Sequence, residues 1–187
     1  MANTDAPFGF RPVRVDGAQE IPVNTYYVPA SDGTALFIGD PVILTGSSDS
    51  NGVAAVTRAT AGSSAYTTGV VIGVKPITDE STIYREASTE RYVVVADNPY
   101  QLFEVQQDSA GGSVPAVTDV GNTVDFIAGT GDTVYGKSAF QLDTSNVGTG
   151  DQFVIEGFVQ ATDNEVGNFA KVFGRFNLHQ KRYLTGV

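Results

Sequence analysis

Short apolar runs separated by turn-forming residues recur along the whole chain, and they restrict the fold more than any other feature. The 187 residues include 21 Gly, 8 Pro, 8 Tyr and 11 Phe but a single Met. β-branched and aromatic residues suit pleated strands, whereas Gly and Pro interrupt them. The runs at 69–77 and 91–97 are continuously apolar, which indicates strands covered on both faces. The sequence therefore predicts an all-β fold, a β-sandwich or barrel-like domain with at most one short helix.

One segment has helical periodicity, and it predicts the single helix over residues 114–124. Pro115 suits the first turn of a helix, although Gly121 weakens the pattern. The valines that recur at spacings of three and four are Val114, Val117, Val120 and Val124. The overlapping region 107–122 is the one candidate for a boundary inside an otherwise single β-rich domain, which we expect over residues 21–187.

The first residues differ in character from the rest of the chain. Residues 7–14 read PFGFRPVR and contain two aromatics, two prolines and two of the 11 basic residues. Proline fixes φ and lacks a backbone donor, so this segment is not expected to start a helix or occupy a central strand. We expect residues 1–20 to form an extended arm that adds to the sheet edge of another chain. The alternative is a terminus that folds back on its own domain.

Both ends of the chain carry residue types that are enriched at protein interfaces. In the arm, the predicted partner-binding residues are Pro7, Phe8, Phe10, Arg11, Pro12 and Arg14. In the C-terminal stretch FNLHQKRY they are Phe176, His179, Lys181, Arg182 and Tyr183, with a solvated tail as the alternative. If the arm is separate from the core, deletion of residues 2–14 should leave thermal unfolding nearly unchanged.

Two further patterns predict local structure. Residues 21–29 alternate apolar and polar side chains with a proline near each end, which is typical of an edge strand. The pair Asn51 and Gly52 favours the positive φ angles of a tight hairpin turn between two strands.

The charge of the chain excludes several classes of partner. With 21 Asp and Glu against 11 Lys and Arg, the net charge is −10, so the body should repel phosphate backbones and anionic membranes. We expect neither a nucleic-acid nor a membrane partner, and no run approaches the length that spans a bilayer. The chain has no Cys, which excludes disulfides and thiolate metal sites.

One stretch imitates a nucleotide-binding motif. Residues 131–138, GDTVYGKS, match the phosphate-binding loop letter for letter, with Gly131, Gly136, Lys137 and Ser138 in the required places. That loop functions only between a strand and a helix whose N-terminal amides hold the phosphates. The residues after 138 are too rich in turn formers for such a helix, and Val134 and Tyr135 fit a strand. We therefore expect no nucleotide and no other cofactor.

Metal and catalytic patterns are equally incomplete. A calcium loop that began at Ser47 would place Arg58 at its closing carboxylate position, so the tight turn is the better interpretation. His179 is the single histidine, which excludes a multi-histidine metal site in one chain and leaves it as a surface or interface side chain. Paired carboxylates are recognised by their separation in space, so a glycosidase-like pair stays open at this point.

Several segments together resemble the head-decoration, or capsid-stabilising cement, proteins of tailed bacteriophages. The likeness lies in residues 6–14, 37–44, 93–110, 136–143, 152–159 and 163–187. The resemblance implies a β-rich sandwich or barrel and no enzymatic activity, with GKS in a strand region that binds no nucleotide. It also implies a homo-oligomer, often a trimer, that is made in the host cytoplasm and binds the major capsid protein on the outer surface of the virion.

Three functions follow from these observations. The first is a structural protein that stabilises a phage head by bridging major capsid protein subunits, with its arm as an added strand. The second is a carbohydrate-binding module or adhesin on a particle surface, with Tyr66, Tyr84, Tyr100 and Tyr135 as candidate contacts. The third is a hydrolase with paired carboxylates, which we rank last.

Overall fold

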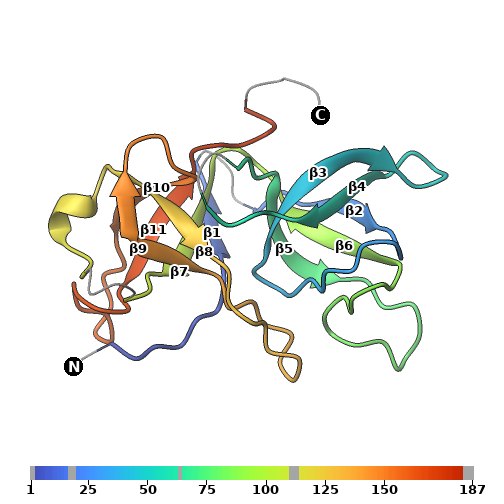
Figure 1. Cartoon of the computed structure of the whole chain (residues 1–187), viewed down its shortest axis with the longest axis horizontal. Coiled ribbons are helices and arrows are strands. Elements are labelled where there is room, and N and C mark those ends of the chain that lie inside the picture. Colours follow the sequence, from blue (N-terminus) through green and yellow to red (C-terminus); the bar gives the residue numbers. More distant parts are fainter. Residues whose placement is uncertain (1–2, 17–19, 63–64, 110–113, 183–187) are drawn as a thin grey trace.

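The protein is nearly all β, as predicted, and its strands form two separate sheets (Figure 1). The computed structural model describes residues 3–16, 20–62, 65–109 and 114–182. One sheet has six strands in the spatial order β1-β7-β11-β10-β8-β9, and the other is a closed barrel in the order β2-β4-β3-β5-β6. The sheet strands are β1 (Arg11–Val15), β7 (Gln101–Gln106), β8 (Thr123–Ile127), β9 (Gln141–Gly148), β10 (Phe153–Phe158) and β11 (Lys171–Phe176). The barrel strands are β2 (Asn24–Val28), β3 (Pro41–Ser48), β4 (Ala54–Arg58), β5 (Gly69–Val74) and β6 (Arg91–Ala96).

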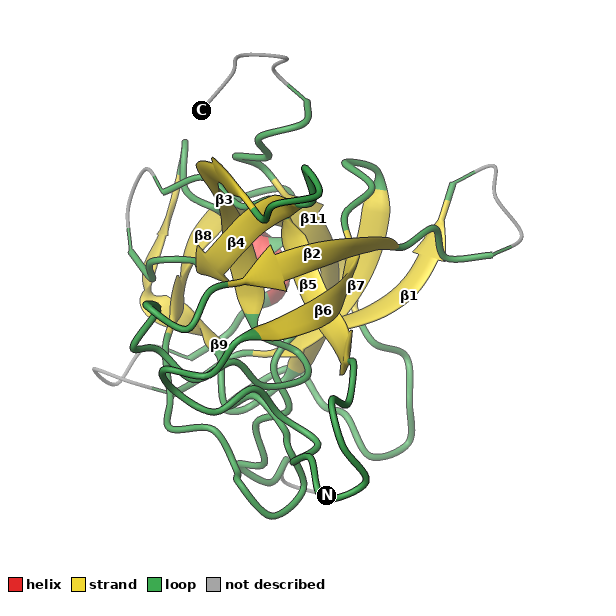
Figure 2. Cartoon of the chain, turned by 90° about the vertical axis from the view of Figure 1, so that its right-hand side faces the viewer, coloured by secondary structure: helices red, strands yellow, loops and turns green. Residues whose placement is uncertain are grey.

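The barrel is formed by consecutive strands and closes through one short parallel contact. Its ladders are antiparallel except where β2 meets β4, at Tyr27 and Ala55 (Figure 2). The edge strand predicted over residues 21–29 is wrong, because β2 also pairs with β6 along its whole length and closure leaves it with neighbours on both sides. The turn at Asn51 and Gly52 is confirmed as the connection of the β3–β4 hairpin, with Gly52 at φ +82°.

A fully buried arginine holds the loops of the barrel together. The Arg85 guanidinium donates to the backbone carbonyls of Pro29, Asp32, Thr34 and Thr89 at 2.6 to 2.8 Å. These carbonyls belong to two loops, which the single planar guanidinium therefore links.

The N-terminal segment is part of the six-stranded sheet. β1 pairs antiparallel with β7, so that Arg11 lies opposite Glu104, and Phe10 is 1% exposed at the centre of the core. The unpaired arm predicted for residues 1–20 is therefore wrong over residues 10–15, and the alternative, a terminus folded back on its own domain, is confirmed. The exclusion of this segment from a central strand holds, since β1 lies at one edge of the sheet.

The helix predicted over residues 114–124 is wrong. The described part of this segment holds a single 3₁₀ turn, η2 (Val117–Asp119), and β8 begins at Thr123. Gly121 lies at φ +92°, which ends the helical path after that turn. The region 107–122, which was the candidate for a domain boundary, connects β7 and β8 of the same sheet. The chain passes from the barrel to the sheet earlier, between β6 and β7. Within the described ranges, no helix has the length and apolar character to cross a membrane.

Candidate binding groove

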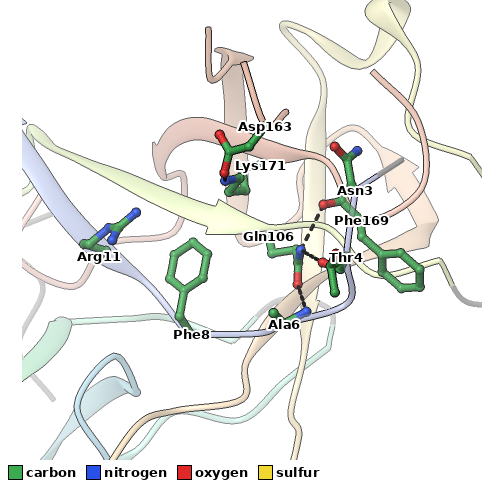
Figure 3. A pocket seen from close by; sticks show the side chains of 9 residues that line it. All are labelled: Asn3, Thr4, Ala6, Phe8, Arg11, Gln106, Asp163, Phe169 and Lys171. Atoms are coloured by element: carbon green, nitrogen blue, oxygen red, sulfur yellow. Dashed lines mark hydrogen bonds and ion pairs between the residues drawn. The ribbon is translucent and has the colours of Figure 1, made fainter. Parts of the chain in front are cut away.

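The N-terminal residues before β1 are fixed along the sheet by one buried glutamine. The Gln106 amide donates to the carbonyls of Thr4 and Phe169 at 2.9 Å and accepts from the Ala6 N–H at 3.0 Å (Figure 3). Asn3 adds hydrogen bonds to the carbonyls of Glu165 and Asn168. These contacts hold residues 3–8 in an extended path over β7 and the loop before β11, so Phe8 occupies a defined position.

Phe8 lies between two hollows that together we call the groove. The first hollow, about 510 Å³, lies between the N-terminal residues, β7 and β11. The second, about 610 Å³, lies between β1 and the barrel and is mainly apolar. Arg11 belongs to both hollows. Its guanidinium carbon lies 4.9 Å from the centre of the Phe8 ring, and one of its guanidinium nitrogens donates to a Glu104 carboxylate oxygen at 2.7 Å. The side chains that give the second hollow its apolar surface and its charge are Pro7, Phe8, Pro12, Ile38, Ile72 and Lys137.

The groove carries one cation that lacks a described carboxylate partner, on a chain that is acidic overall. Of its three cationic side chains, Arg11 pairs with Glu104 and Lys171 with Asp163, whereas no ion pair holds Lys137 among the described residues. The Lys171 ammonium lies 2.7 Å from Asp163 and lowers the pKa of that carboxyl. Lys137 lies over the ring of Tyr135 at 5.2 Å. A net positive lining on a chain of net charge −10 favours an anionic partner at this place.

Exposed apolar side chains continue the groove onto neighbouring loops. Ile38, Ile83, Val134 and Tyr135 are between 37% and 74% exposed, and we call them the loop patch. The Ile38 N–H donates to the carbonyl of Gly136, which lies against Ile83, so the loops are in contact. Val134 and Tyr135 were predicted inside a strand, which is wrong, because Asp132 accepts hydrogen bonds from both of their backbone N–H groups and closes a turn.

Behind the groove, three segments that are distant in sequence meet through two glycines and a serine, which we call the glycine junction. Gly9, at φ +72°, packs so closely that a Cβ there would lie 2.4 Å from the Cβ of Ser138 and 2.5 Å from the carbonyl oxygen of Gly39. The Phe10 N–H donates to Gly39 and the Ser138 N–H to Ile38. The chain after Ser138 continues into β9, so the phosphate-loop letters form part of this junction and lack the helix that phosphate binding needs.

A buried carboxyl group lies beside the junction. Asp40 is 2% exposed, accepts the Phe37 N–H at 2.9 Å and is hydrogen-bonded to the side chain of Ser138. Burial raises its pKa to about 6, because removal from water disfavours the charged form more than these hydrogen bonds favour it.

The predicted N-terminal binding residues divide into two groups. Five of the six line the second hollow, Pro7, Phe8, Phe10, Arg11 and Pro12, although Phe10 is only 1% exposed. The surface role predicted for Phe10 is wrong, because its ring packs against four other Phe rings at 5.2 to 6.4 Å. Arg14 is exposed but lies outside both hollows, 3.8 Å from a carboxylate oxygen of Asp16.

The predicted C-terminal binding residues are mostly engaged within the chain. Phe176 and His179 are each 1% exposed, so a surface role for them is wrong. Lys181 donates to the buried carboxylate of Asp97, and Arg182 is exposed but lies over the ring of Tyr100 at 5.8 Å. Tyr183 lies outside the described residues. The C-terminal segment, residues 178–182, is therefore bound to the barrel, with Leu178 and Gln180 hydrogen-bonded to the backbone of Thr67.

Burial also determines the charge of the single histidine. It lowers the pKa of His179 to about 4, and the nearby cation of Arg182 acts in the same direction. The imidazole is therefore neutral near pH 7, and its Nδ1 accepts the Lys181 N–H at 3.1 Å.

The tyrosines proposed for sugar binding do not lie in one cluster. Tyr84 stacks on Phe37, with 4.8 Å between the ring centres. Tyr100 lies under the Arg182 guanidinium of the C-terminal segment, and Tyr66 precedes Thr67, which pairs with His179 of that same segment.

Among the described residues, no group of three or more His, Asp or Glu side chains is arranged to hold a metal ion. No family model, curated protein or solved structure matches the chain. Sequence reasoning had missed Ile38, Ile72, Lys137 and Lys171, because residues that contribute one side chain each from separate segments leave no local pattern.

Proposed function

We propose that the protein is a structural decoration protein that binds the outer surface of a bacteriophage head and stabilises its lattice by bridging major capsid protein subunits. In this role it is a homo-oligomer, for example a trimer, and performs no enzymatic step. The all-β fold agrees with the fold that the resemblance to head-decoration proteins implies.

The groove is the observation that carries this proposal. It combines an apolar surface with a cation, Lys137, that has no ion pair within the described ranges, on a chain of net charge −10. Six of its lining residues come from the N-terminal segment that resembles decoration proteins, namely Ala6, Pro7, Phe8, Phe10, Arg11 and Pro12. Such a protein needs an attractive face toward the capsid and a solvated face away from it. The groove and the loop patch supply the first, and the acidic remainder of the surface supplies the second.

The structure changes the expected mode of attachment. A flexible arm loses conformational entropy when it orders on the capsid, whereas residues 3–8 are already held by Gln106 and Asn3. We therefore propose binding through a preformed surface. Several weak contacts of this kind add up when an oligomer binds a repeating lattice, because the later contacts are intramolecular.

Co-sedimentation tests the proposal. Purified protein is mixed with empty shells of a phage major capsid protein, and bound and free fractions are separated by centrifugation. We expect saturable binding at a fixed number of copies per capsid subunit and a higher melting temperature of the decorated shells. Free protein at every concentration would contradict the proposal, and dose-dependent binding on a glycan array would then favour the carbohydrate-binding alternative.

A further inference from the structure

We infer that the groove is the docking site for an extended segment of a capsid subunit that presents apolar side chains and at least one carboxylate. This inference rests on the proposed function and adds to it the chemistry of the partner segment. The second hollow of the groove lies between the edge strand β1 and β5 of the barrel, and residues of both strands line it.

The shape and composition of the second hollow favour side chains as the recognised feature. Pro7, Phe8, Pro12, Ile38 and Ile72 give it an apolar lining, and apolar partner groups gain free energy on leaving water there. The exposed edge of β1 is a poor template for strand addition, because Pro12 lacks an N–H and the β1–β7 register shifts between Pro12 and Arg14. The partner is therefore held mainly by its side chains.

The charge distribution favours a carboxylate on the partner. Lys137 lines the second hollow with Phe8 and has no ion pair among the described residues, while Glu104 and Asp163 balance the charges of Arg11 and Lys171. Two further hollows on the described surface carry Glu165 or Asp79 and no lining Lys or Arg. The overall charge of −10 opposes a phosphate backbone, which would meet the acidic surface beyond the groove. A peptide with one or two carboxylates beside apolar groups matches the cations without that repulsion.

Charge reversal and apolar-to-acidic substitutions test the inference, each with a matched control outside the groove. The groove variants are Lys137→Glu and Ile38→Asp, and the controls are Lys75→Glu and Ile77→Asp, whose side chains are exposed. Binding of each full-length variant to empty shells is measured by co-sedimentation over a series of salt concentrations. Thermal unfolding of each variant alone verifies that all four remain folded.

We expect both groove variants to bind roughly tenfold more weakly or worse, as substitutions at interface anchors do, while the controls bind like the wild type. Lys137→Glu should also flatten the salt dependence of binding, since a charge at a binding surface acts through screened attraction. Equal binding by groove variants and controls would overturn the inference and leave the proposed function standing. Absence of wild-type binding to the shells would overturn both.

Photo-crosslinking identifies the occupant. With p-benzoylphenylalanine in place of Phe8, we expect crosslinks to one short stretch of the capsid protein that contains apolar residues and an Asp or Glu. A crosslink to a second copy of this chain, or to a capsid stretch that is basic, would overturn the assignment even if the groove variants bind weakly.

Discussion

The six-stranded sheet and the barrel bury different kinds of side chain. The core against the sheet contains six Phe side chains, Phe10, Phe103, Phe126, Phe140, Phe153 and Phe176. The barrel core is mainly aliphatic, with Val28, Val42, Val56, Val71, Val93 and Val95 beside Leu36 and Tyr26. A closed barrel of five strands has a narrow interior that short branched side chains fill, whereas the sheet covers a wider space that aromatic rings fill edge to face.

The two regions also differ in where their strands come from. Residues 24–96 supply every strand of the barrel, whereas the sheet combines β1 with strands from residues 101–176. The sheet therefore depends on the N-terminal segment, and the aromatic core is incomplete without Phe10. A substitution near the N-terminus should therefore destabilise the sheet more than the barrel. Substitution of Phe10, which has the largest expected effect, tests this dependence.

Phe10→Ala should destabilise the protein by about 3–5 kcal/mol, since it removes a ring that contacts four others and leaves a cavity. Val95→Ala in the barrel is the matched change and should cost about 1–3 kcal/mol, because it deletes fewer buried atoms. Urea unfolding gives both values, and hydrogen exchange resolves them by region. Amides of β7 and β11 should lose more protection than those of β6 in Phe10→Ala. An equal loss of amide protection in both regions would contradict the claim that the sheet depends more on the N-terminal segment than the barrel does.

The same dependence reverses an expectation drawn from the sequence. Deletion of residues 2–14 was expected to leave thermal unfolding nearly unchanged, but it removes Phe10 and most of β1. The structure instead predicts a large loss of stability, so the truncated chain is not a suitable probe of binding.

The two regions are in close contact at the glycine junction, and an added methyl group there should disrupt this contact. Gly9→Ala forces a left-handed φ on alanine and a clash with Ser138 and Gly39, for a cost of about 3 kcal/mol. Gly52→Ala is the control, because Gly52 has φ +82° with open space around it and should cost only about 1 kcal/mol. Urea unfolding gives both values. Equal costs for the two variants would show that backbone conformation alone determines the requirement for glycine.

The sequence predicted the fold class because strand and turn signals are local. Val93 and Val95 belong to an apolar run that is buried in the barrel, and Asn51 with Gly52 marked its hairpin correctly. The partner strand of β1 could not be predicted in this way, because Arg11 and Glu104 are 93 residues apart and no local sequence pattern at one indicates a contact with the other. Phe10 and Phe8 look equivalent in the sequence, yet one is enclosed by rings and the other lines the groove.

The candidate site was predictable only in part, for a similar reason. The cluster of proline, aromatic and basic residues in the N-terminal segment pointed to a binding surface, and Pro7, Phe8, Arg11 and Pro12 line the groove. The C-terminal cluster has comparable composition, but Lys181 pairs with Asp97 inside the chain. Composition alone could not distinguish a cation that faces a partner from one that anchors its own terminus.

The smallest expected effect concerns two buried titratable groups where distant segments meet, Asp40 at the glycine junction and His179 in the C-terminal segment. The pKa of Asp40 is raised to about 6, so its protonated form favours folding, and this contribution is lost as the pH rises from about 4 to 6. The pKa of His179 is lowered to about 4, so its neutral form favours folding, and this contribution is lost as the pH falls from about 6.5 to 4. The two dependences oppose each other and partly cancel in the wild type.

Asp40→Asn and His179→Gln should reveal the two contributions separately. Relative to Asp40→Asn, the wild type should lose on the order of 2 kcal/mol of stability between pH 4 and 6, and relative to His179→Gln it should gain a similar amount over the same interval. Urea unfolding at half-unit pH steps gives both differences, and comparison with the wild type cancels the carboxylates that all three proteins share. His179 is faced by Arg182, Lys181 and Asp97, and the wild type and both variants carry these three groups. If stability changed with pH in the same way in the two variants, Asp40 and His179 would not contribute in opposite directions. That result would contradict the opposite pKa shifts of the two groups.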